Sequence, residues 1–472
     1  MTIAIKPTLK ISTASKLPTD KNVAVVRITE EDHSLTYLTA KGQHEIRMGV
    51  GKRKDMNRRK LITLVRDIIN SAKAHKAKKV AVVLDDLLFP NVKASHKDIA
   101  ELVATNMEMA NYAYDTHKAM PKEGRGHVSE TIIVTNEGAA KQGLARGQTI
   151  GQYVNLCRDI SNTPAHSLPP MKAAETAKRL AKGTKVKIAV MGEKELERKG
   201  FGGVTAIGQG AKSESAFIVM EYWGGKKSEK PIVFCGKGVV FDSGGLNIKP
   251  GVHMNEMHMD KTGAGATIAT ILLSEKLGIK RNIISITPFV ENMPGGNSIR
   301  PGDIIRTLSG KTVQIDNTDA EGRVILSDAI TYAKRYKPAL LVDVATLTGH
   351  MMVALGLHLS GLFCRDEKMA WEFTEMANEA GDYMWPMPLW DVYEPEIKGT
   401  YADITNSSPN RYGGSAEAAM FLYQFAKDLD CPWVHLDIAG RMVSTTSDHL
   451  AKGSPGDPVR FLLKIVEEWD GK

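Results

Sequence analysis

The sequence predicts an α/β protein with two domains, a small N-terminal α/β domain and a larger C-terminal α/β/α domain with a central mixed sheet. Short apolar runs of strand length alternate with helical periodicity along the chain, which is typical of α/β layers. The 472 residues exceed one ordinary hydrophobic core, and 42% apolar with 25% charged residues is usual for globular proteins.

The N-terminal part has the pattern of a small α/β domain. Apolar runs predict strands at 23–28, 80–84 and 131–134, and an amphipathic pattern predicts a helix over 59–74. A further helix is expected over 148–160. Prolines after residue 163 stop helical propagation. The expected organisation is therefore an N-terminal domain at 1–145, a linker helix and loop at 146–170, and the larger domain at 171–472.

The larger domain repeats the alternation of strands and helices. Strands are predicted at 187–190, 216–221, 231–235, 283–288 and 340–344, and helices near 263–277, 320–336 and 416–426. In open α/β sheets, ligands bind beyond the carboxyl ends of the strands. Polar residues that directly follow these strands are therefore candidate site residues.

The net charge of +8 belongs to the N-terminal domain. Residues 1–150 hold 25 Lys and Arg against 16 Asp and Glu, which leaves 37 against 38 for the rest. The densest basic segment is 52–60. Contact with nucleic-acid phosphates is one interpretation of this segment, and a solvated basic face is the favoured one.

Compartment and redox state also follow from the sequence. The first residues lack an apolar stretch of signal-peptide length, and no run of about 18 apolar residues predicts a membrane span. We therefore expect a cytoplasmic protein that does not bind membranes. Four widely spaced cysteines without a Cys-x-x-Cys pair argue against a disulfide framework or a thiolate zinc site.

Acidic side chains mark a candidate metal site. The segment Asn-Thr-Asp-Ala-Glu-Gly-Arg at 317–323 places Asp319, Glu321 and Arg323 where a strand passes into a helix. A glycine-rich segment upstream adds four further polar residues, Lys237, Asp242, Lys249 and Asp260. Carboxylates are hard oxygen donors, and several around one cavity repel each other without cations. The combination predicts a two-metal hydrolase.

Each part of this pattern also has a simpler interpretation. Thr318 and Glu321 fit a capping box, and Asp242 with the glycines after it fits an Asx turn that ends a strand. Lysines taken singly are usually solvated. Asp319 and Glu321 are two residues apart, so they share a metal only if one of them lies off the regular helix. The combination of all these residues is what favours the metal site.

These segments resemble the signatures of the leucine aminopeptidases, the cytosol aminopeptidases of peptidase family M17. Residues 317–323 match the most specific motif of the family letter for letter. The resemblance continues through Thr346-Leu347-Thr348-Gly349 and through 433–440, and it covers the chain from about Asn155 onward. It implies a leucyl aminopeptidase, a binuclear metallo-exopeptidase whose catalytic domain is the larger one.

The resemblance implies a role for each matched residue. Two divalent cations, Mn²⁺ or Zn²⁺, would hold a bridging water that attacks the peptide. Their ligands would be Lys237, Asp242, Asp260, Asp319 and Glu321, and Lys237 would have to bind as a neutral amine. Lys249 and Arg323 would be catalytic, the first through the oxyanion and the second through a bound bicarbonate that acts as general base. Substrate contacts would come from Lys249, Asp260, Met257, Thr346 and Leu347.

Substrates and assembly are implied in the same way. The free amine of the substrate would bind a metal and Asp260, and bulky apolar N-terminal residues such as leucine would be preferred. A homohexamer with enclosed active sites would restrict substrates to short peptides.

Three departures from the family pattern concern the site. Lys261 follows Asp260 where many relatives carry an apolar residue. Altered metal affinity is one interpretation of this cation beside a ligand, and an ammonium group that points to solvent is the favoured one. His350 follows Gly349 in place of a small residue, and the segment 409–415 also differs from the commoner glycine-rich version.

Other classes of protein fit less well. None of the 13 histidines lies in His-Glu-x-x-His, and residues 241–245 lack the first glycine of Gly-x-Ser-x-Gly, so a zincin and a serine hydrolase are disfavoured. A nucleic-acid-binding protein with an aminopeptidase-like domain has only the basic N-terminal segment in its favour. A catalytically inactive relative is disfavoured because the polar set is intact.

Overall fold

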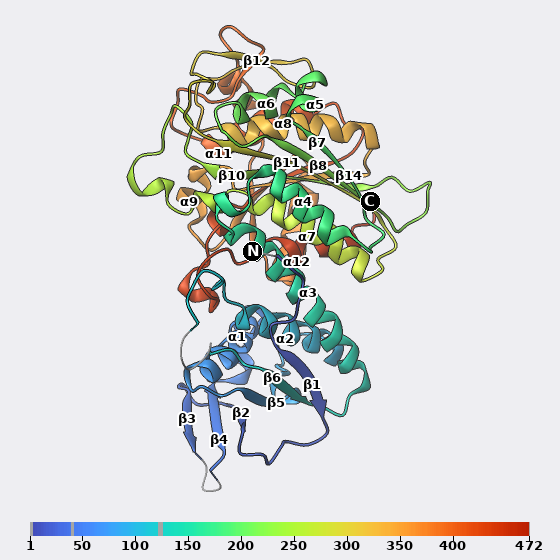
Figure 1. Ribbon diagram of the computed structural model, residues 1–472. Coiled ribbons are helices and arrows are strands. Elements are labelled where there is room, and N and C mark those ends of the chain that lie inside the picture. Colours follow the sequence, from blue (N-terminus) through green and yellow to red (C-terminus); the bar gives the residue numbers. More distant parts are fainter. Residues whose placement is uncertain (1–2, 39–41, 121–125, 472) are drawn as a thin grey trace. The chain divides into compact units, whose positions relative to one another are not determined.

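The computed structural model describes residues 3–38, 42–120 and 126–471, and the chain forms two compact units (Figure 1). The smaller unit holds 4–155 together with 444–452, and the larger holds 1–3, 156–443 and 453–472. The division falls at residue 155, inside the segment 146–170 that the sequence assigns to a linker. No sequence pattern indicated that 444–452 joins the smaller unit.

The smaller unit is a six-stranded sheet with helices. In the described residues its strand order is β1-β6-β5-β2-β4-β3, and only β3 pairs antiparallel. The strands are β1 (Lys10–Ala14), β2 (Val23–Thr29), β3 (Leu35–Leu38), β4 (His44–Gly49), β5 (Lys79–Val83) and β6 (Glu130–Val134). The helices are α1 (Arg58–Ala74), α2 (His96–Asn111) and α3 (Gly138–Asn162), and the last extends into the larger unit.

Helix α3 begins ten residues earlier than the sequence predicted. Gly143 and Gly147 made the missed part resemble a loop, but together with Gly151 they lie four residues apart on one helical face. A Cβ at Gly143 would come 2.1 Å from Lys97 O, and one at Gly147 would come 2.1 Å from Glu101 O. The glycines therefore permit close packing of α3 against α2.

Part of the basic segment 52–60 has local partners. Arg53 Nη2 donates to the carbonyl oxygens of Asp86 and Leu88 at 3.0 and 2.8 Å, and its guanidinium lies 4.6 Å from the centre of the Phe89 ring. Lys60 Nζ donates to Asp55 O. These contacts favour a structural role for both side chains.

The larger unit is built on a mixed nine-stranded sheet. In the described residues the order is β16-β15-β18-β14-β9-β11-β8-β7, and β10 pairs with β11. The strands are β7 (Lys187–Gly192), β8 (Ala216–Trp223), β9 (Ile232–Gly236), β10 (Gly238–Asp242), β11 (Asn282–Asn292), β14 (Leu340–Ala345), β15 (Ser360–Cys364), β16 (Met384–Met387) and β18 (Trp433–Asp437). A small sheet adds β12 (Ile304–Arg306), β13 (Thr312–Gln314) and β17 (Ile404–Thr405).

Helices cover both faces of this sheet (Figure 1). One face carries α5 (Glu193–Arg198), α6 (Gly202–Gly208) and α8 (Glu321–Ala333), and the other carries α4 (Pro170–Ala181), α7 (Thr262–Lys276) and α12 (Val459–Glu468). The remaining helices are α9 (Gly349–Leu355), α10 (Glu367–Ala380) and α11 (Gly414–Ala426). The expected mixed α/β/α architecture is confirmed.

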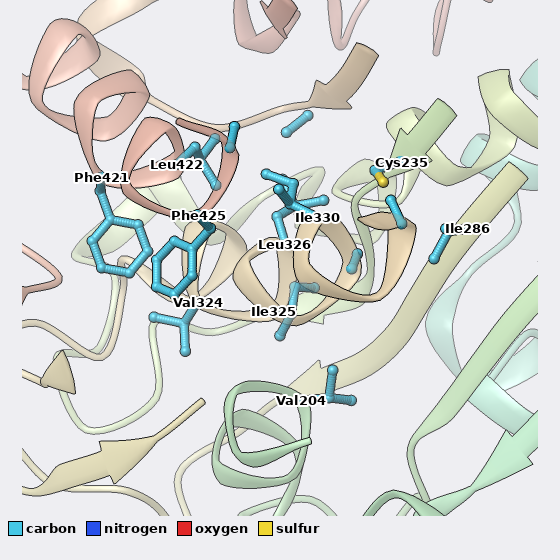
Figure 2. Close-up of a cluster of buried hydrophobic side chains, with 14 of the residues drawn as sticks. Val204, Cys235, Ile286, Val324, Ile325, Leu326, Ile330, Phe421, Leu422 and Phe425 are labelled. Atoms are coloured by element: carbon cyan, nitrogen blue, oxygen red, sulfur yellow. The ribbon is translucent and has the colours of Figure 1, made fainter. Parts of the chain in front are cut away.

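The core fixes the elements that carry the site. Central strands β9 and β14 are fully buried and, apart from Asp343 of β14, carry no charged side chain, as expected for strands with helices on both faces. Figure 2 shows Ile325, Leu326 and Ile330 of α8 in one cluster with Phe421 and Phe425 of α11. Burial of such side chains stabilises the fold by roughly 1.5–3 kcal/mol each.

In the described chain no helix is both long and apolar enough to span a bilayer.

Candidate active site

Polar residues gather at the carboxyl ends of adjacent strands of the large sheet. Lys237 follows β9, Asp242 ends β10, Thr346 follows β14 and Asp437 ends β18. Strands β9, β14 and β18 run parallel, so their carboxyl ends meet at one edge. This is the edge where the sequence predicted a ligand site.

The turn after β10 is an Asx turn, as the sequence indicated. Gly244 N donates to Asp242 Oδ1 at 2.9 Å. Gly244 and Gly245 have φ of 86° and 66°, which favours glycine at both positions. A Cβ at Gly244 would also come 2.9 Å from Asp319 Oδ1. The turn thus lets the segment from Asp242 to Lys249 lie directly against the segment before α8.

The capping box, which was the simpler interpretation of Thr318 and Glu321, is absent. Helix α8 begins at Glu321 with Ala320 as its N-cap residue, which makes no side-chain cap. Thr318 Oγ1 instead donates to Gly244 O at 2.6 Å and accepts from Asn247 N at 2.8 Å. The hydroxyl joins the two site segments. Asp319 lies before the helix and Glu321 lies in its first turn. The two carboxylates are therefore not both fixed by the regular helix, which would point residues two apart in different directions, and they can approach the same metal.

Two lysines join the acidic residues. Lys237 Nζ lies 2.8 Å from both Asp260 Oδ2 and Glu321 Oε1. Lys249 Nζ lies 2.8 Å from Asp242 Oδ2 and 2.6 Å from Asp319 Oδ1. The structure therefore brings together Lys237, Lys249, Asp242, Asp260, Asp319 and Glu321.

Four carboxylates face only two ammonium groups in this cluster. Burial and neighbouring carboxylates raise the pKa of Asp242, Asp260 and Asp319, that of Asp319 to about 7. Burial would also raise the pKa of Glu321, but Lys237 and Lys249 outweigh it and hold that pKa below its usual value. The four carboxylates therefore repel one another, and additional positive charge would stabilise the site.

The same carboxylates raise the pKa of the two lysines. Burial would lower the pKa of Lys237, but Asp260, Glu321 and Asp242 outweigh it and raise that pKa above its usual value. The pKa of Lys249 is raised in the same way, chiefly by Asp242. Both amines are therefore protonated at neutral pH, and Lys237 must lose its proton before it can serve as a ligand.

The donor set fits divalent cations. Oxygen atoms of Asp242, Asp319 and Glu321 all lie within 4.8 Å of one another. Asp260 is connected to this group through Lys237. Four carboxylates and one amine are donors that Mn²⁺, Zn²⁺ and Mg²⁺ accept.

Lys261 does not point to solvent, and that prediction was wrong. It is fully buried, and its Nζ donates to the carbonyl oxygens of Ser161, Thr163 and His258, the Thr163 bond being 2.8 Å. Burial lowers the pKa of this amine to about 7. Sequence reasoning missed the burial because the three acceptors are backbone carbonyls, which no side-chain pattern reveals.

The predicted substrate-contact residues lie close to the cluster. Thr346 Oγ1 donates to Asp260 Oδ1 at 2.6 Å, and Thr346 O accepts from Lys237 Nζ at 2.8 Å. Leu347 is half-buried against the core, and Met257 is half-buried three residues before Asp260. His350 Nε2 lies 3.0 Å from Arg411 O, which connects the two segments that depart from the family pattern.

Asn292 and Asn406 contact site residues but had no signal in the sequence. Asn292 Nδ2 donates to Asp242 Oδ1 at 2.8 Å and to Thr318 O at 3.0 Å. Asp437 Oδ2 accepts from Thr348 Oγ1 at 2.6 Å. Arg323 Nη1 donates to Asn406 O at 2.8 Å. The motif contained Asp437 but did not show which groups it holds.

Comparisons with known proteins agree with this arrangement. The catalytic-domain model of the cytosol aminopeptidase family matches residues 155–463, and the N-terminal-domain model of that family matches 46–121. A probable cytosol aminopeptidase of Roseiflexus castenholzii is 39% identical over 378 residues, which is 79% of this chain and 77% of the relative. One of Methylobacillus flagellatus is 36% identical over 432 residues, 90% of this chain and 85% of the relative.

Solved structures show the same fold. The bottromycin maturation enzyme BotP in complex with Mn superposes with a TM-score of 0.85 at 28% identity, over 95% of this chain and 99% of that one. The chain therefore belongs to the cytosol aminopeptidase family, peptidase family M17, and is an aminopeptidase, a hydrolase that removes N-terminal residues from peptides.

Proposed function

We propose that this chain is a metal-dependent leucyl aminopeptidase that uses two divalent cations and prefers leucine and other bulky apolar N-terminal residues. The observation that carries the proposal is the buried cluster in which oxygens of Asp242, Asp319 and Glu321 lie within 4.8 Å of one another. Membership of the cytosol aminopeptidase family supports the reaction type.

Five side chains would hold the cations. Asp242 and Glu321 would bridge them, Asp319 would complete one site, and Lys237 with Asp260 would complete the other. When bound, the cations would lower the pKa of a water between them and polarise the scissile carbonyl. The solved BotP structure contains Mn, which supports manganese, and zinc suits the same donors.

Other side chains would orient the substrate and stabilise charge. The Lys249 ammonium, kept protonated by Asp242, would donate to the oxygen that gains negative charge in the transition state. Asp260, held by Thr346, would receive the free amine of the substrate. Because an acylated amine carries no charge, this contact would restrict the enzyme to free N-termini.

Arg323 would hold the anion that accepts a proton during hydrolysis. Arg323 is 8% exposed, and its guanidinium presents a fork that suits a planar carboxylate-like anion. Bicarbonate is the external candidate for that anion.

Substrate range, assembly and location belong to the same proposal. An apolar pocket near Met257, Thr346 and Leu347 would favour bulky residues, and the adaptable Met257 would admit several of them. We further propose short peptides as substrates, a homohexameric assembly and a cytoplasmic location. Exposed apolar side chains such as Val353 and Tyr401 are available for subunit contacts. Light scattering that gave a monomer under active conditions would contradict the hexamer.

The experiment is hydrolysis of a Leu-x dipeptide by protein stripped with a chelator and then reloaded with manganese or zinc. We expect no turnover by the stripped protein, turnover after reloading, and none with the N-acetylated dipeptide. Equal cleavage of the acetylated and free dipeptides would rule out the aminopeptidase mechanism.

A further inference from the structure

Asn292 is the last residue of β11, and it lies beside the candidate ligand Asp242. Strand β10 runs parallel to β11, and Asp242 and Asn292 are partners in the register of the pair. Partners in register point their side chains to the same face of a sheet. Asn292 is 2% exposed, so its amide is buried next to the Asp242 carboxylate.

Both hydrogens of the Asn292 amide are used by the site. Nδ2 donates to Asp242 Oδ1 at 2.8 Å and to Thr318 O at 3.0 Å. A backbone carbonyl can only accept, and so can an ionised carboxylate, so the nitrogen of the amide has to face both oxygens. A hydroxyl has one hydrogen and an ionised carboxylate has none, so neither group could replace the amide in both bonds.

These two bonds connect the two segments that carry the candidate ligands. Asp242 ends β10, and Thr318 directly precedes Asp319 in the segment before α8. The backbone of Asn292 adds to the connection, because its carbonyl oxygen accepts from Ser243 N at 3.0 Å and from Ser243 Oγ at 2.7 Å. Asn292 therefore holds the turn after β10 and the segment before α8 at the same time.

The two oxygens of the Asp242 carboxylate have different partners. Oδ1 accepts from Asn292 Nδ2 and from Gly244 N, at 2.8 and 2.9 Å. Oδ2 lies 2.8 Å from Lys249 Nζ. Two donors on Oδ1 fix the plane of the carboxylate and leave Oδ2 as the oxygen that faces the ammonium group. Because an amide is neutral, it orients the carboxylate without cancelling the negative charge that attracts cations.

We propose that Asn292 is a positioning residue of the metal centre, which sets the orientation of the Asp242 carboxylate and its spacing from the segment of Asp319 before any cation binds. The proposal rests on the proposed function, in which Asp242 bridges both cations. Asn292 itself would touch neither the cations nor the substrate. Loss of a hydrogen-bond donor to a ligating side chain typically costs about 10–100-fold in metal affinity or activity.

Asn282, the first residue of β11, offers a matched comparison. It is also 2% exposed, and its Nδ2 donates to Lys226 O and Glu229 O at 2.7 and 2.8 Å. Each of the two amide nitrogens thus makes two bonds to oxygen, but those of Asn282 lie at the opposite end of the strand from Asp242. A purely structural role would make the two asparagines equivalent.

The test measures Mn²⁺ binding to chelator-stripped protein by equilibrium dialysis, which does not depend on turnover. Leucine is close to asparagine in size and lacks both N–H groups, so Asn292→Leu is compared with Asn282→Leu and the wild type. We expect the Mn²⁺ concentration at half-saturation to rise about 10–100-fold in Asn292→Leu. Both binding steps should weaken, because Asp242 would bridge both cations.

The control variant should separate metal binding from stability. Asn282→Leu should bind Mn²⁺ as the wild type does. Both Asn282→Leu and Asn292→Leu should lower the melting temperature, because each change leaves two acceptors without their donor. At saturating Mn²⁺, Asn292→Leu should hydrolyse a Leu-x dipeptide with the KM of the wild type, because Asn292 contacts no substrate group.

Each other outcome has a defined meaning. If Asn292→Leu does not fold, Asn292→Ala gives the same comparison with a smaller side chain. The proposal would be overturned by wild-type Mn²⁺ affinity in a folded Asn292 variant, by equal losses of affinity in the Asn292 and Asn282 variants, or by an increased KM at metal saturation. Unfolding of both Asn292 variants beside a folded Asn282→Leu would also overturn it. Wild-type protein that binds no Mn²⁺ would instead refute the proposed function itself.

Discussion

Lys237 Nζ lies 2.8 Å from Glu321 Oε1, so that the residue after β9 is joined to the first residue of α8. Without cations this contact is an ion pair between a protonated amine and a carboxylate. With cations the same amine would have to become neutral and act as a ligand. The exchange of a proton for a metal is central to the proposed site.

Replacing Lys237 by arginine should remove one metal site. Arginine keeps the charge but cannot lose its proton, so it cannot serve as a neutral donor. We expect turnover to fall on the order of 100-fold or more and the bound metal, measured by elemental analysis, to fall in parallel. Lys227→Arg, at an exposed position, should behave as the wild type. Unchanged metal content in Lys237→Arg would exclude Lys237 as a ligand.

Gly322→Ala should displace Lys237 without removing any ligand. A Cβ at Gly322 would come 2.6 Å from Lys237 Cε and 2.7 Å from its Nζ. We expect a loss of turnover and a destabilisation of about 1–3 kcal/mol, as for overpacked interiors. Gly138→Ala, whose Cβ would meet nothing within 4 Å, is the control for adding a methyl group. Wild-type turnover by Gly322→Ala would show that the amine can move without consequence.

Lys261→Met should destabilise the catalytic unit. The change leaves the carbonyls of Ser161, Thr163 and His258 without the donor that now binds them. We expect a loss of roughly 1–3 kcal/mol, measured as a lower melting temperature. Lys276→Met, at an exposed position of α7, should have little effect. Equal melting temperatures for the two variants would mean that Lys261 is dispensable.

Glu108 should make stability depend on pH in the smaller unit. Burial raises its pKa from 4.5 to about 7, so the folded state binds the proton more tightly than the unfolded state. The stabilisation of the folded state by proton binding to Glu108 is therefore complete below pH 4.5 and is lost as the pH rises through about 7. The free energy of unfolding should fall by on the order of 3 kcal/mol over this range.

Glu108→Gln tests this sign. The variant cannot ionise, and its carbonyl oxygen can still accept from Thr8 N. The melting temperature of Glu108→Gln relative to the wild type should therefore be higher at pH 8 than at pH 5. A difference that does not change between the two pH values would contradict the assignment.

Apolar runs were the most informative part of the sequence for the fold. Strands β9 and β14 and helices α7, α8 and α11 were predicted within a few residues because their burial imposes a pattern of apolar residues. The start of α3 was missed because glycines that permit close helix packing look like loop residues. The pairing of 444–452 with the smaller unit was missed because it depends on the folded chain.

The candidate site was predictable where charged residues cluster in short motifs. It was not predictable where a side chain binds backbone groups, as Thr318 and Lys261 do, because backbone acceptors leave no mark in the sequence.

The central claim is most directly tested by the initial rate of leucine amide hydrolysis as Mn²⁺ is added stepwise to chelator-stripped protein. The binuclear proposal predicts no rate at the start and a plateau near two equivalents per chain, with Asp319→Asn far below the wild type throughout. A full rate in the presence of chelator, or wild-type turnover by Asp319→Asn, would contradict it.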